Sequence, residues 1–339
     1  MFAPRSGWVV LALVAFCAAA CSAPLTRGPL GLGTLLPHGD DSTAAWGEYR
    51  LHVPASCSPD EPCPLVVAFH GAFSSPAEME EESGLSRLAD REGFLVVYPY
   101  GSGFLGLLQH WNSGHCCGPA QENGVDDVAF TRRVIAAVRE EMAVDPSRIY
   151  LVGMSNGGMM VHRLASELSD VVAAAAAVSG TIGGRPSEGA EIWRVATPRR
   201  PVPMLLIHGD ADEIVPWEGG DDPFGSEGRT FLGVDDAVEF WRVANHADGP
   251  PASEVLLGGR LSRTRWGGDA PDSEVVLYRV AGWPHAWPGG EYTRDLPLDD
   301  ALLGYEAADV IWPFLVGHTR PSRGTGDGAN ERAPGPCAR

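Results

Sequence analysis

Short apolar runs recur through the middle of the chain, and most are followed by a stretch with helical periodicity. Six of these runs are apolar almost throughout rather than alternating with polar residues; they occupy 64–70, 94–100, 149–154, 171–180, 203–209 and 274–280. Continuous apolar runs of this length are typical of strands in a parallel sheet that is covered on both faces. The pattern therefore predicts six buried strands.

The segments between the runs predict helices. Residues 127–142 place Phe130, Val134, Val138 and Met142 at four-residue intervals, which is one side of a helix. Similar patterns occupy 157–168, 235–246 and 305–315. A repeated order of strand and then helix predicts an α/β fold, with a mostly parallel sheet and helices on both faces.

The two ends of the chain differ from its middle. Arg5, followed by an apolar run over 8–20 that is too short to span a bilayer, predicts a signal peptide over 1–21. "AAAC", which ends at Cys21, is similar to a bacterial lipoprotein cleavage box that would lipidate this cysteine; ordinary secretory cleavage nearby is the alternative. We predict a tether over 22–45, one α/β domain over 46–317 and a disordered tail over 318–339.

Charge narrows the range of partners. The 339 residues include 25 basic and 44 acidic side chains, which give a formal net charge of −19. Such an excess repels nucleic acid and anionic lipid. We expect no nucleic-acid partner, and contact with a membrane only through a lipid anchor at Cys21. Export would place the mature protein in an extracellular or cell-envelope location, where cysteines meet oxidising conditions.

Seven cysteines are present, two of them in the leader. Cys57 and Cys63 bracket a short loop that contains proline, and we predict that they form a disulfide. Cys116 and Cys117 would then bond to each other, or each would need a partner that the sequence does not identify. Cys337 is left over and has no predicted role.

"VGMSNGGM" places Ser155 in the pattern GxSxG, directly after a predicted strand and before a predicted helix. In a nucleophile elbow the serine occupies a strained turn, and its flanking positions are small because strand and helix pass close together. Gly153, Gly157 and Gly158 meet that requirement. The alternative is an ordinary turn serine in a chain with 42 glycines. Because a turn serine needs none of these flanking features, we predict that Ser155 is a nucleophile.

A serine nucleophile needs a histidine base, and the histidine needs a carboxylate to orient it. In α/β folds with such an elbow, the order along the chain is serine, then acid, then histidine. Asp212 follows the strand predicted at 203–209, and we prefer it to its neighbours Asp210 and Glu213 as the acid. Its loop should lie at the same edge of the sheet as Ser155.

Three histidines follow Asp212 along the chain. His246 lies in a helical pattern and His318 begins the predicted tail, whereas His285 lies in a loop just after the last predicted strand. We therefore predict His285 as the base, although an isolated loop histidine is more often a surface residue.

A tetrahedral oxyanion also needs two backbone donors. Asn156, directly after the nucleophile, is predicted to supply one. The other is expected from "FHGAF" at 69–73, from Ala72 or, as the alternative, from Phe73.

Three tryptophans lie in loops near these motifs. Trp111, Trp217 and Trp287 are predicted to line a substrate cleft, where aromatic walls would suit an acyl or phenolic group. An ordinary place in the core is the alternative for each.

Five motifs carry a family resemblance when they are taken together and in order: "FHGAFSSP", "WNSGHCCGPAQENGVDDVAF", "GMSNGGMM", "HGDADEIVPWEGG" and "GWPHAWPGG". They resemble the polyhydroxybutyrate depolymerase and feruloyl esterase family of secreted α/β-hydrolases. The resemblance implies an α/β-hydrolase fold and hydrolysis of carboxylic esters through an acyl-enzyme, with no metal and no organic cofactor. Its nucleophile, acid and base fall on Ser155, Asp212 and His285.

The sequence also departs from the family pattern in two places. "HGAF" lacks the small or cysteine-containing turn common in relatives, which bears on the Ala72 donor. Pro284 precedes His285 where relatives usually have glycine, and it restricts that loop.

Two further groups have competing interpretations. The family carries adjacent cysteines at 116–117, which implies a structural role; a metal site made with His110 and His115 is disfavoured, because neighbouring cysteines rarely reach tetrahedral geometry together. Asp126 and Asp127 precede Ser155 and open a predicted helix, so we expect them to cap it rather than act as catalytic acids.

The predicted function is a serine carboxylic-ester hydrolase, and two other classes compete with it. One is a peptidase of the same fold, and the other is a lipoprotein that uses the scaffold only to bind a polymer. For the esterase, a hydroxybutyrate polyester, a hydroxycinnamoyl sugar and an acetylated polysaccharide all remain open as substrates.

Overall fold

The computed structural model describes residues 48–104, 107–223, 228–267, 270 and 272–320, and all of them belong to one compact unit. The predicted leader and tether, which include Cys21, lie outside the described residues. So does the part of the predicted tail after Arg320, which includes Cys337. Within it, no helix combines the length and the apolar composition that crossing a membrane requires.

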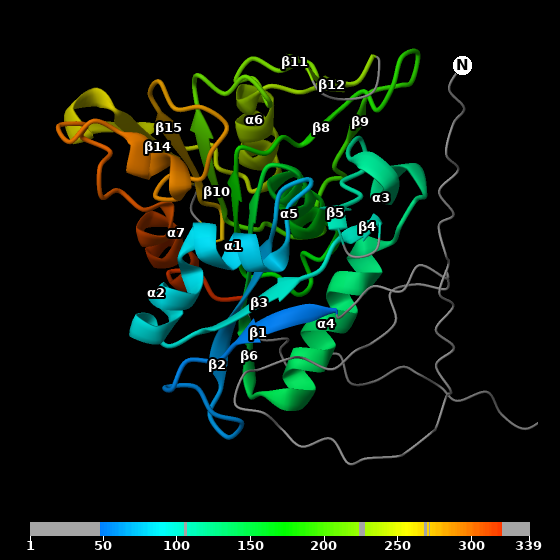
Figure 1. Ribbon diagram of the computed structural model, residues 1–339, viewed down its shortest axis with the longest axis vertical. Helices are drawn as coiled ribbons and strands as arrows, with labels where there is room; N and C mark the ends of the chain where they lie inside the picture. Colours follow the sequence, from blue (N-terminus) through cyan, green and yellow to red (C-terminus); the bar gives the residue numbers. More distant parts are fainter. Residues whose placement is uncertain (1–47, 105–106, 224–227, 268–269, 271, 321–339) are drawn as a thin grey trace, which may run out of the picture. The chain divides into compact units, whose positions relative to one another are not determined.

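A nine-stranded sheet forms the centre of the fold (Figure 1). In spatial order it consists of β1 (Tyr49–His52), β3 (Leu95–Pro99), β2 (Cys63–Phe69), β6 (Val144–Met154), β7 (Ala174–Val178), β10 (Met204–Gly209), β15 (Val275–Val280), β14 (Leu261–Trp266) and β13 (Ala252–Leu256). The six strands from β3 to β15 pair in parallel, whereas β1, β14 and β13 pair antiparallel at the two ends. The six predicted apolar runs are these parallel strands.

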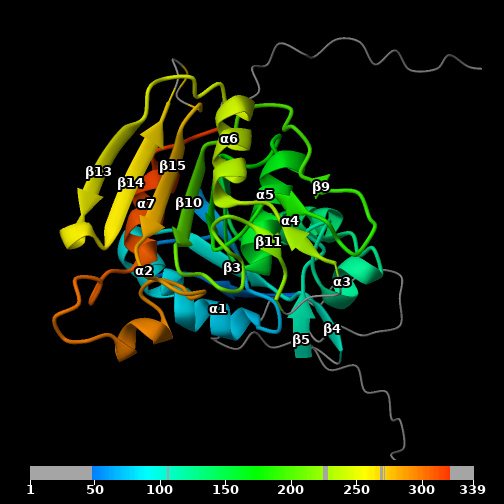
Figure 2. The ribbon, with the colours of Figure 1, turned by 90° about the horizontal axis from the view of Figure 1, so that it is seen from above.

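Helices cover both faces of the sheet, as Figure 2 shows. Successive residues of a strand point to opposite faces, so Leu65 and Val67 of β2 join one core and Val66 and Ala68 join the other. The first core lies under α4 (Asp127–Glu141), α5 (Asn156–Glu167) and α6 (Val234–Ala244). The second lies under α1 (Pro76–Ser83), α2 (Leu85–Glu92) and α7 (Ala307–Val316). This is the predicted α/β architecture, and its strand order is that of an α/β-hydrolase.

Smaller elements decorate the carboxyl edge of the sheet and the loops around it. They are the strand pairs β4 (Ser102–Phe104) with β5 (Leu107–His110), β8 (Gly183–Gly184) with β9 (Trp193–Arg194) and β11 (Gly220–Asp221) with β12 (Thr230–Phe231), the helix α3 (Gly118–Glu122), and the 3₁₀ turns η1 (Leu257–Gly259) and η2 (Glu291–Asp295). Most of them follow the carboxyl ends of parallel strands, and they therefore lie around the sheet edge that carries Ser155, Asp212 and His285.

Contacts near both ends of the described part hold its terminal segments to the fold. Cys57 and Cys63 form a disulfide at the start of β2. At the other end, residues 318–320, which the sequence assigned to a disordered tail, are instead tied to the fold through His318 and Arg320. His318 Nε2 lies 3.0 Å from Glu274 Oε2, and the backbone N–H of Arg320 donates to the Ser147 carbonyl at 2.8 Å.

Candidate active site

Ser155 lies in the sharp turn between β6 and α5, at the carboxyl edge of the sheet. Its φ of 55° and ψ of −123° lie in a region that non-glycine residues rarely adopt. Its backbone N–H donates to the Val178 carbonyl of β7 at 2.9 Å. The strained turn expected of a nucleophile elbow is therefore present.

The glycines around Ser155 allow three backbone segments to meet. A Cβ on Gly157 would lie 2.5 Å from the His70 carbonyl oxygen and closer still to that of Phe69. A Cβ on Gly153 would collide with the Gly157 carbonyl. The first turn of α5 therefore packs directly against the end of β2, which brings the elbow and the loop after β2 to the same place.

Asp212 follows β10, and its side chain is fully buried. One carboxylate oxygen accepts hydrogen bonds from the backbone N–H groups of Ile214 and Val215, at 3.0 and 2.8 Å. The other accepts from His285 Nδ1 at 2.7 Å. Burial acts to raise the pKa of Asp212, but the hydrogen bond and charge of His285 and the Val215 N–H outweigh it and hold the pKa below its usual value. The carboxylate therefore stays ionised and orients the imidazole.

The His285 loop is held rigidly where it leaves β15. Asp210, which the sequence offered as an alternative acid, instead accepts from the Gly282 N–H at 2.6 Å and from Arg279 Nε at 2.9 Å. The Ala211 N–H donates to the Trp283 carbonyl at 3.2 Å, which joins the acid loop to the histidine loop. Asp210 thus anchors the loop, and its neighbour Asp212 is left to face His285.

The structure joins Asp212 to His285, but it does not join His285 to Ser155 by a hydrogen bond. Ser155 Oγ makes no hydrogen bond to any other described residue, and both side chains lie at the same edge of the sheet. In hydrolases without a substrate, the contact between nucleophile and base is often long and shortens in the complex. The arrangement is therefore an imidazole oriented by a buried carboxylate, at the sheet edge where Ser155 occupies a strained turn.

The loop after β2 lies against this serine. A Cβ placed on Gly71 would be 3.5 Å from Ser155 Cβ and 4.0 Å from its Oγ. The Phe73 N–H, the alternative oxyanion donor, donates to the Gln109 carbonyl at 2.9 Å and is not available. Within the described part of the chain, the N–H groups of Ala72 and Asn156 have no acceptor, so both can face a ligand.

Comparison with known proteins identifies the family. The model of one family, esterase PHB depolymerase, matches residues 48–215. A protein of Nocardia uniformis subsp. tsuyamanensis assigned as an esterase, NocK, is 31% identical over 312 residues, which cover 87% of this chain and 86% of that protein. The chain belongs to the PHB depolymerase family of esterases. It is accordingly a hydrolase of carboxylic esters.

Other relatives of this esterase match a shorter part of their own length. Feruloyl esterase B of Piromyces equi is 32% identical over 200 residues, which are 58% of this chain and 35% of that protein. The chain thus spans about a third of that relative. An acetyl xylan esterase structure from Aspergillus awamori aligns with a TM-score of 0.49 and 16% identity, over 73% of this chain and 91% of that chain.

The tryptophans of the esterase do not all lie where the sequence placed them. Trp111 and Trp287 are 0% and 1% exposed, so neither ring has a surface that a substrate could touch, and the predicted substrate contact does not hold for them. Both fill the core instead. Trp217 is partly exposed, with the Arg279 guanidinium 5.1 Å from its ring centre, and its contact with a substrate stays a prediction.

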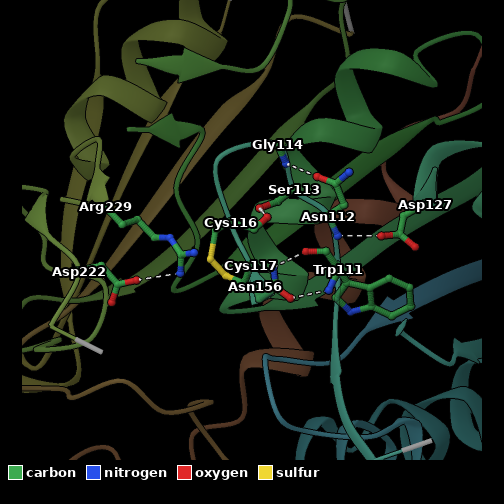
Figure 3. Close-up of a disulfide and its surroundings, with 10 residues drawn as sticks. All are labelled: Trp111, Asn112, Ser113, Gly114, Cys116, Cys117, Asp127, Asn156, Asp222 and Arg229. Carbon is green, nitrogen blue, oxygen red and sulfur yellow. Dashed lines mark hydrogen bonds and ion pairs between the residues drawn. A yellow bond between two sulfur atoms is a disulfide. The ribbon is translucent and has the colours of Figure 1, made fainter. Parts of the chain in front are cut away.

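The loop that contains Cys116 and Cys117 leads into α3, and Figure 3 shows it beside Asn156, the residue that follows Ser155. The two cysteines are bonded to each other, which leaves the alternative metal site without its thiolate ligands. Asp126 caps α4 as expected, because its carboxylate accepts from the Ala129 N–H at 2.9 Å. Asp127 does not cap: it accepts from the Asn112 N–H at 2.7 Å and so holds this loop.

A cavity of about 420 Å³ lies between the loop after β2 and the loop after His285. Ser74 lines it from one side and Gly289 and Gly290 from the other, together with charged side chains of both signs: Glu78, Glu81, Glu82, Arg87, Glu291 and Arg294. Burial raises the pKa of Glu82, against a hydrogen bond from the Trp287 backbone and the charge of His285. This cavity could not be predicted from the sequence, because it is formed by residues far apart in the chain.

Proposed function

We propose that this esterase is a serine hydrolase that acts through an acyl-enzyme, with Ser155 as nucleophile, His285 as base and Asp212 as the acid that orients it. The observation that carries the proposal is the hydrogen bond between Asp212 and His285, at the sheet edge where Ser155 occupies a strained turn. Membership of a family of ester hydrolases supports it.

The reaction follows from the roles of these groups. Neutral His285 takes the proton of Ser155 Oγ as that oxygen attacks the ester carbonyl, and Asp212 stabilises the imidazolium that forms. The N–H groups of Ala72 and Asn156 donate to the oxyanion. The proton then passes from His285 to the leaving alcohol. Water enters, His285 takes its proton, and the hydroxide attacks the acyl group; Ser155 recovers a proton as the acid product leaves.

The substrate we favour is an ester of a hydroxyl-rich alcohol. The cavity between the Ser74 and Gly289 loops is lined by carboxylates and arginines, which hydrogen-bond to hydroxyl groups and offer little apolar surface to a polyester chain. A relative named feruloyl esterase and another named acetylxylan esterase are consistent with such an alcohol. A relative named poly(3-hydroxyalkanoate) depolymerase keeps the polyester as the alternative.

We also propose that the protein is exported and works outside the cell or in its envelope. The support is the sequence of the leader, with Arg5, the apolar run over 8–20 and the box that ends at Cys21. Metabolic labelling with a fatty acid, compared between the wild type and Cys21→Ser, separates a lipid anchor from ordinary secretion.

Ser155→Ala is the first test of the proposed function. We expect kcat on a short-chain aryl ester to fall by at least about 10³-fold, because the acyl-enzyme can no longer form. Ser166→Ala, on the same helix and with a buried hydroxyl, is the matched control and should keep wild-type activity. Retention of activity by Ser155→Ala would refute the assignment.

Two measurements separate the competing classes and substrates. An organophosphonate should label wild-type Ser155; absence of labelling and of turnover would favour a protein that only binds a polymer. Rates on a hydroxycinnamoyl sugar, an acetylated polysaccharide, a hydroxybutyrate oligomer and a peptide amide then rank the substrates. A preference for the oligomer would contradict the hydroxyl-rich alcohol, and a preference for the amide would favour the peptidase.

A further inference from the structure

The side chain of Asn156 is turned away from the substrate side and is almost completely buried, at 1% exposure. Its Oδ1 accepts from the backbone N–H of Trp111 at 2.7 Å, and its Nδ2 donates to the Trp111 carbonyl at 2.9 Å. Figure 3 shows this pair beside the Cys116–Cys117 bridge. The amide thus pairs with one backbone residue through two bonds, as a neighbouring strand would.

Trp111 carries this connection to the loop after β2. Its ring is fully buried, and its Nε1–H donates to the His70 carbonyl at 3.0 Å. The centres of the Trp111 and His70 rings also lie 4.9 Å apart. Because Asn156 fixes the backbone of Trp111, it also fixes the point from which this indole reaches His70.

His70 orients the peptide unit that contains the Ala72 N–H. A carbonyl oxygen can only accept, so the ring hydrogen of His70 is on Nδ1, which donates to the Gly71 carbonyl at 2.7 Å. Nε2 is then an acceptor for the Gly101 N–H at 3.2 Å, which also donates to Gln109 Oε1 at 2.9 Å. Burial lowers the pKa of His70 to about 4, which keeps the ring neutral at the pH of the reaction. A peptide unit is planar and trans, so a fixed Gly71 carbonyl fixes the direction of the Ala72 N–H.

We propose that Asn156 is a positioning residue for the oxyanion site: through Trp111 and His70, its side chain sets the Ala72 N–H relative to its own backbone N–H. One residue then supplies the first donor and aligns the second. The inference rests on the proposed function, because it assigns a task to the two donors of that reaction.

Asn156→Ala tests the first link. Oxyanion donors act in the transition state, so their misalignment should lower kcat and leave KM nearly unchanged. Because loss of one donor costs about 10²- to 10³-fold, and misalignment costs less than loss, we expect kcat to fall by roughly 10- to 100-fold.

Trp111→Phe tests the second link, because it keeps a buried aromatic ring and removes the Nε1–H that donates to the His70 carbonyl, together with part of the indole. We expect a fall in kcat of about 3- to 10-fold. If both residues act through one chain of contacts, the double variant should lose clearly less than the product of the two single effects. Independent, multiplying effects would overturn the proposal.

The chain offers a matched control in Asn245, which is also 1% exposed. It makes the same two-bond pairing with Val202, at 2.9 and 2.7 Å, but just before β10 and thus at the opposite edge of the sheet from Ser155. Asn245→Ala should lower the free energy of unfolding about as much as Asn156→Ala does and leave kcat unchanged. If the two variants lose the same kcat, the role of Asn156 is only structural.

Labelling distinguishes a failure of this inference from a failure of the proposed function. A wild-type protein that an organophosphonate does not label at Ser155 and that hydrolyses no ester overturns both. If the wild type is labelled and active while Asn156→Ala keeps kcat within about twofold, only the positioning role is overturned. Slower labelling of a folded Asn156→Ala, at full final extent, supports it.

Discussion

At the scale of single residues, Ser155 combines a strained backbone conformation with a side-chain hydroxyl that has no hydrogen-bond partner among the described residues. A non-glycine residue with φ of 55° and ψ of −123° costs on the order of 1–3 kcal/mol. The turn persists because β6 and α5 are both packed around it and because its N–H is bonded to Val178. The strain places the hydroxyl away from all described partners, where it can meet a substrate.

Ser155→Gly should therefore be more stable than Ser155→Ala. Glycine adopts positive φ without a steric penalty, and we expect its free energy of unfolding to be higher by about 1 kcal/mol after the entropy of the unfolded chain is counted. Denaturant unfolding of the two inactive variants measures the difference. At Ser166, which lies in the last turn of α5 with helical backbone, glycine should instead be less stable than alanine. Equal stability of the two Ser155 variants would contradict a strained turn.

The positions of the proposed catalytic residues could be predicted from sequence, because chain order and element boundaries define them. Ser155, Asp212 and His285 each follow an apolar strand, and parallel strands end at one edge. The roles of Asp210, His70 and Trp111 could not be predicted in this way. Each depends on which carbonyl or N–H lies within 3 Å, and that is decided by how loops from different strands pack.

At the scale of elements, the close approach of α5 and β2 determines the site. Gly157 is the point of contact, because its Cα faces the carbonyls of Phe69 and His70. These carbonyls belong to the end of β2 and the start of the loop that contains Ala72, the proposed second oxyanion donor. A change in the spacing between α5 and β2 would therefore move the Ala72 N–H as well as the helix.

Gly157→Ala is expected to lower the free energy of unfolding by about 2–3 kcal/mol, because a backbone carbonyl cannot move aside as a side chain can. We also expect kcat/KM on an aryl ester to fall more than about 10-fold. Gly267→Ala is the control, since a Cβ there meets no atom within 4 Å, and it should stay within about 0.5 kcal/mol of the wild type. Similar effects of both substitutions would show that α5 can shift without consequence.

The elements that the sequence did not predict lie at the edges of the sheet or carry much charge. β13 is almost wholly exposed and β14 is half-exposed, so neither has the apolar run that marks a buried strand. α1 and α2 are rich in acidic and basic residues and are divided at Gly84, which has φ of 66° and ends the first helix. Their helical structure depends on tertiary packing against the second core, rather than on a periodic apolar pattern.

At the scale of the whole molecule, burial of histidine makes the fold sensitive to acid. Desolvation lowers the pKa of His115 and His162 to about 3 and that of His70 to about 4. In the unfolded chain these groups take up protons near pH 6.5. The unfolded state therefore binds more protons between about pH 6.5 and 4, so the stability that is present in full above pH 6.5 is lost as the pH falls.

Each such histidine should remove about 1 kcal/mol from the free energy of unfolding between pH 6 and pH 5. We expect His162→Asn to lose about 1 kcal/mol less of its free energy of unfolding than the wild type between pH 6 and pH 5. The amide oxygen of the new asparagine can still accept from Trp241 Nε1. Guanidinium unfolding at the two pH values measures the difference. His246→Asn, at an exposed position, is the matched control and should leave the fall unchanged. An unchanged fall in His162→Asn would contradict a neutral, buried ring.

The bond between Cys116 and Cys117 joins sequence neighbours, so it encloses no loop. The entropic gain from a disulfide grows with loop length, and this bridge therefore adds almost nothing to cohesion of the fold. What it adds is a compact sulfur face against Met159, Val215 and Phe231; Met159 lies one helical turn after Ser155, and the Val215 N–H is bonded to Asp212. Protein made in a reducing cytosol would keep its architecture and differ in the packing of this small cluster.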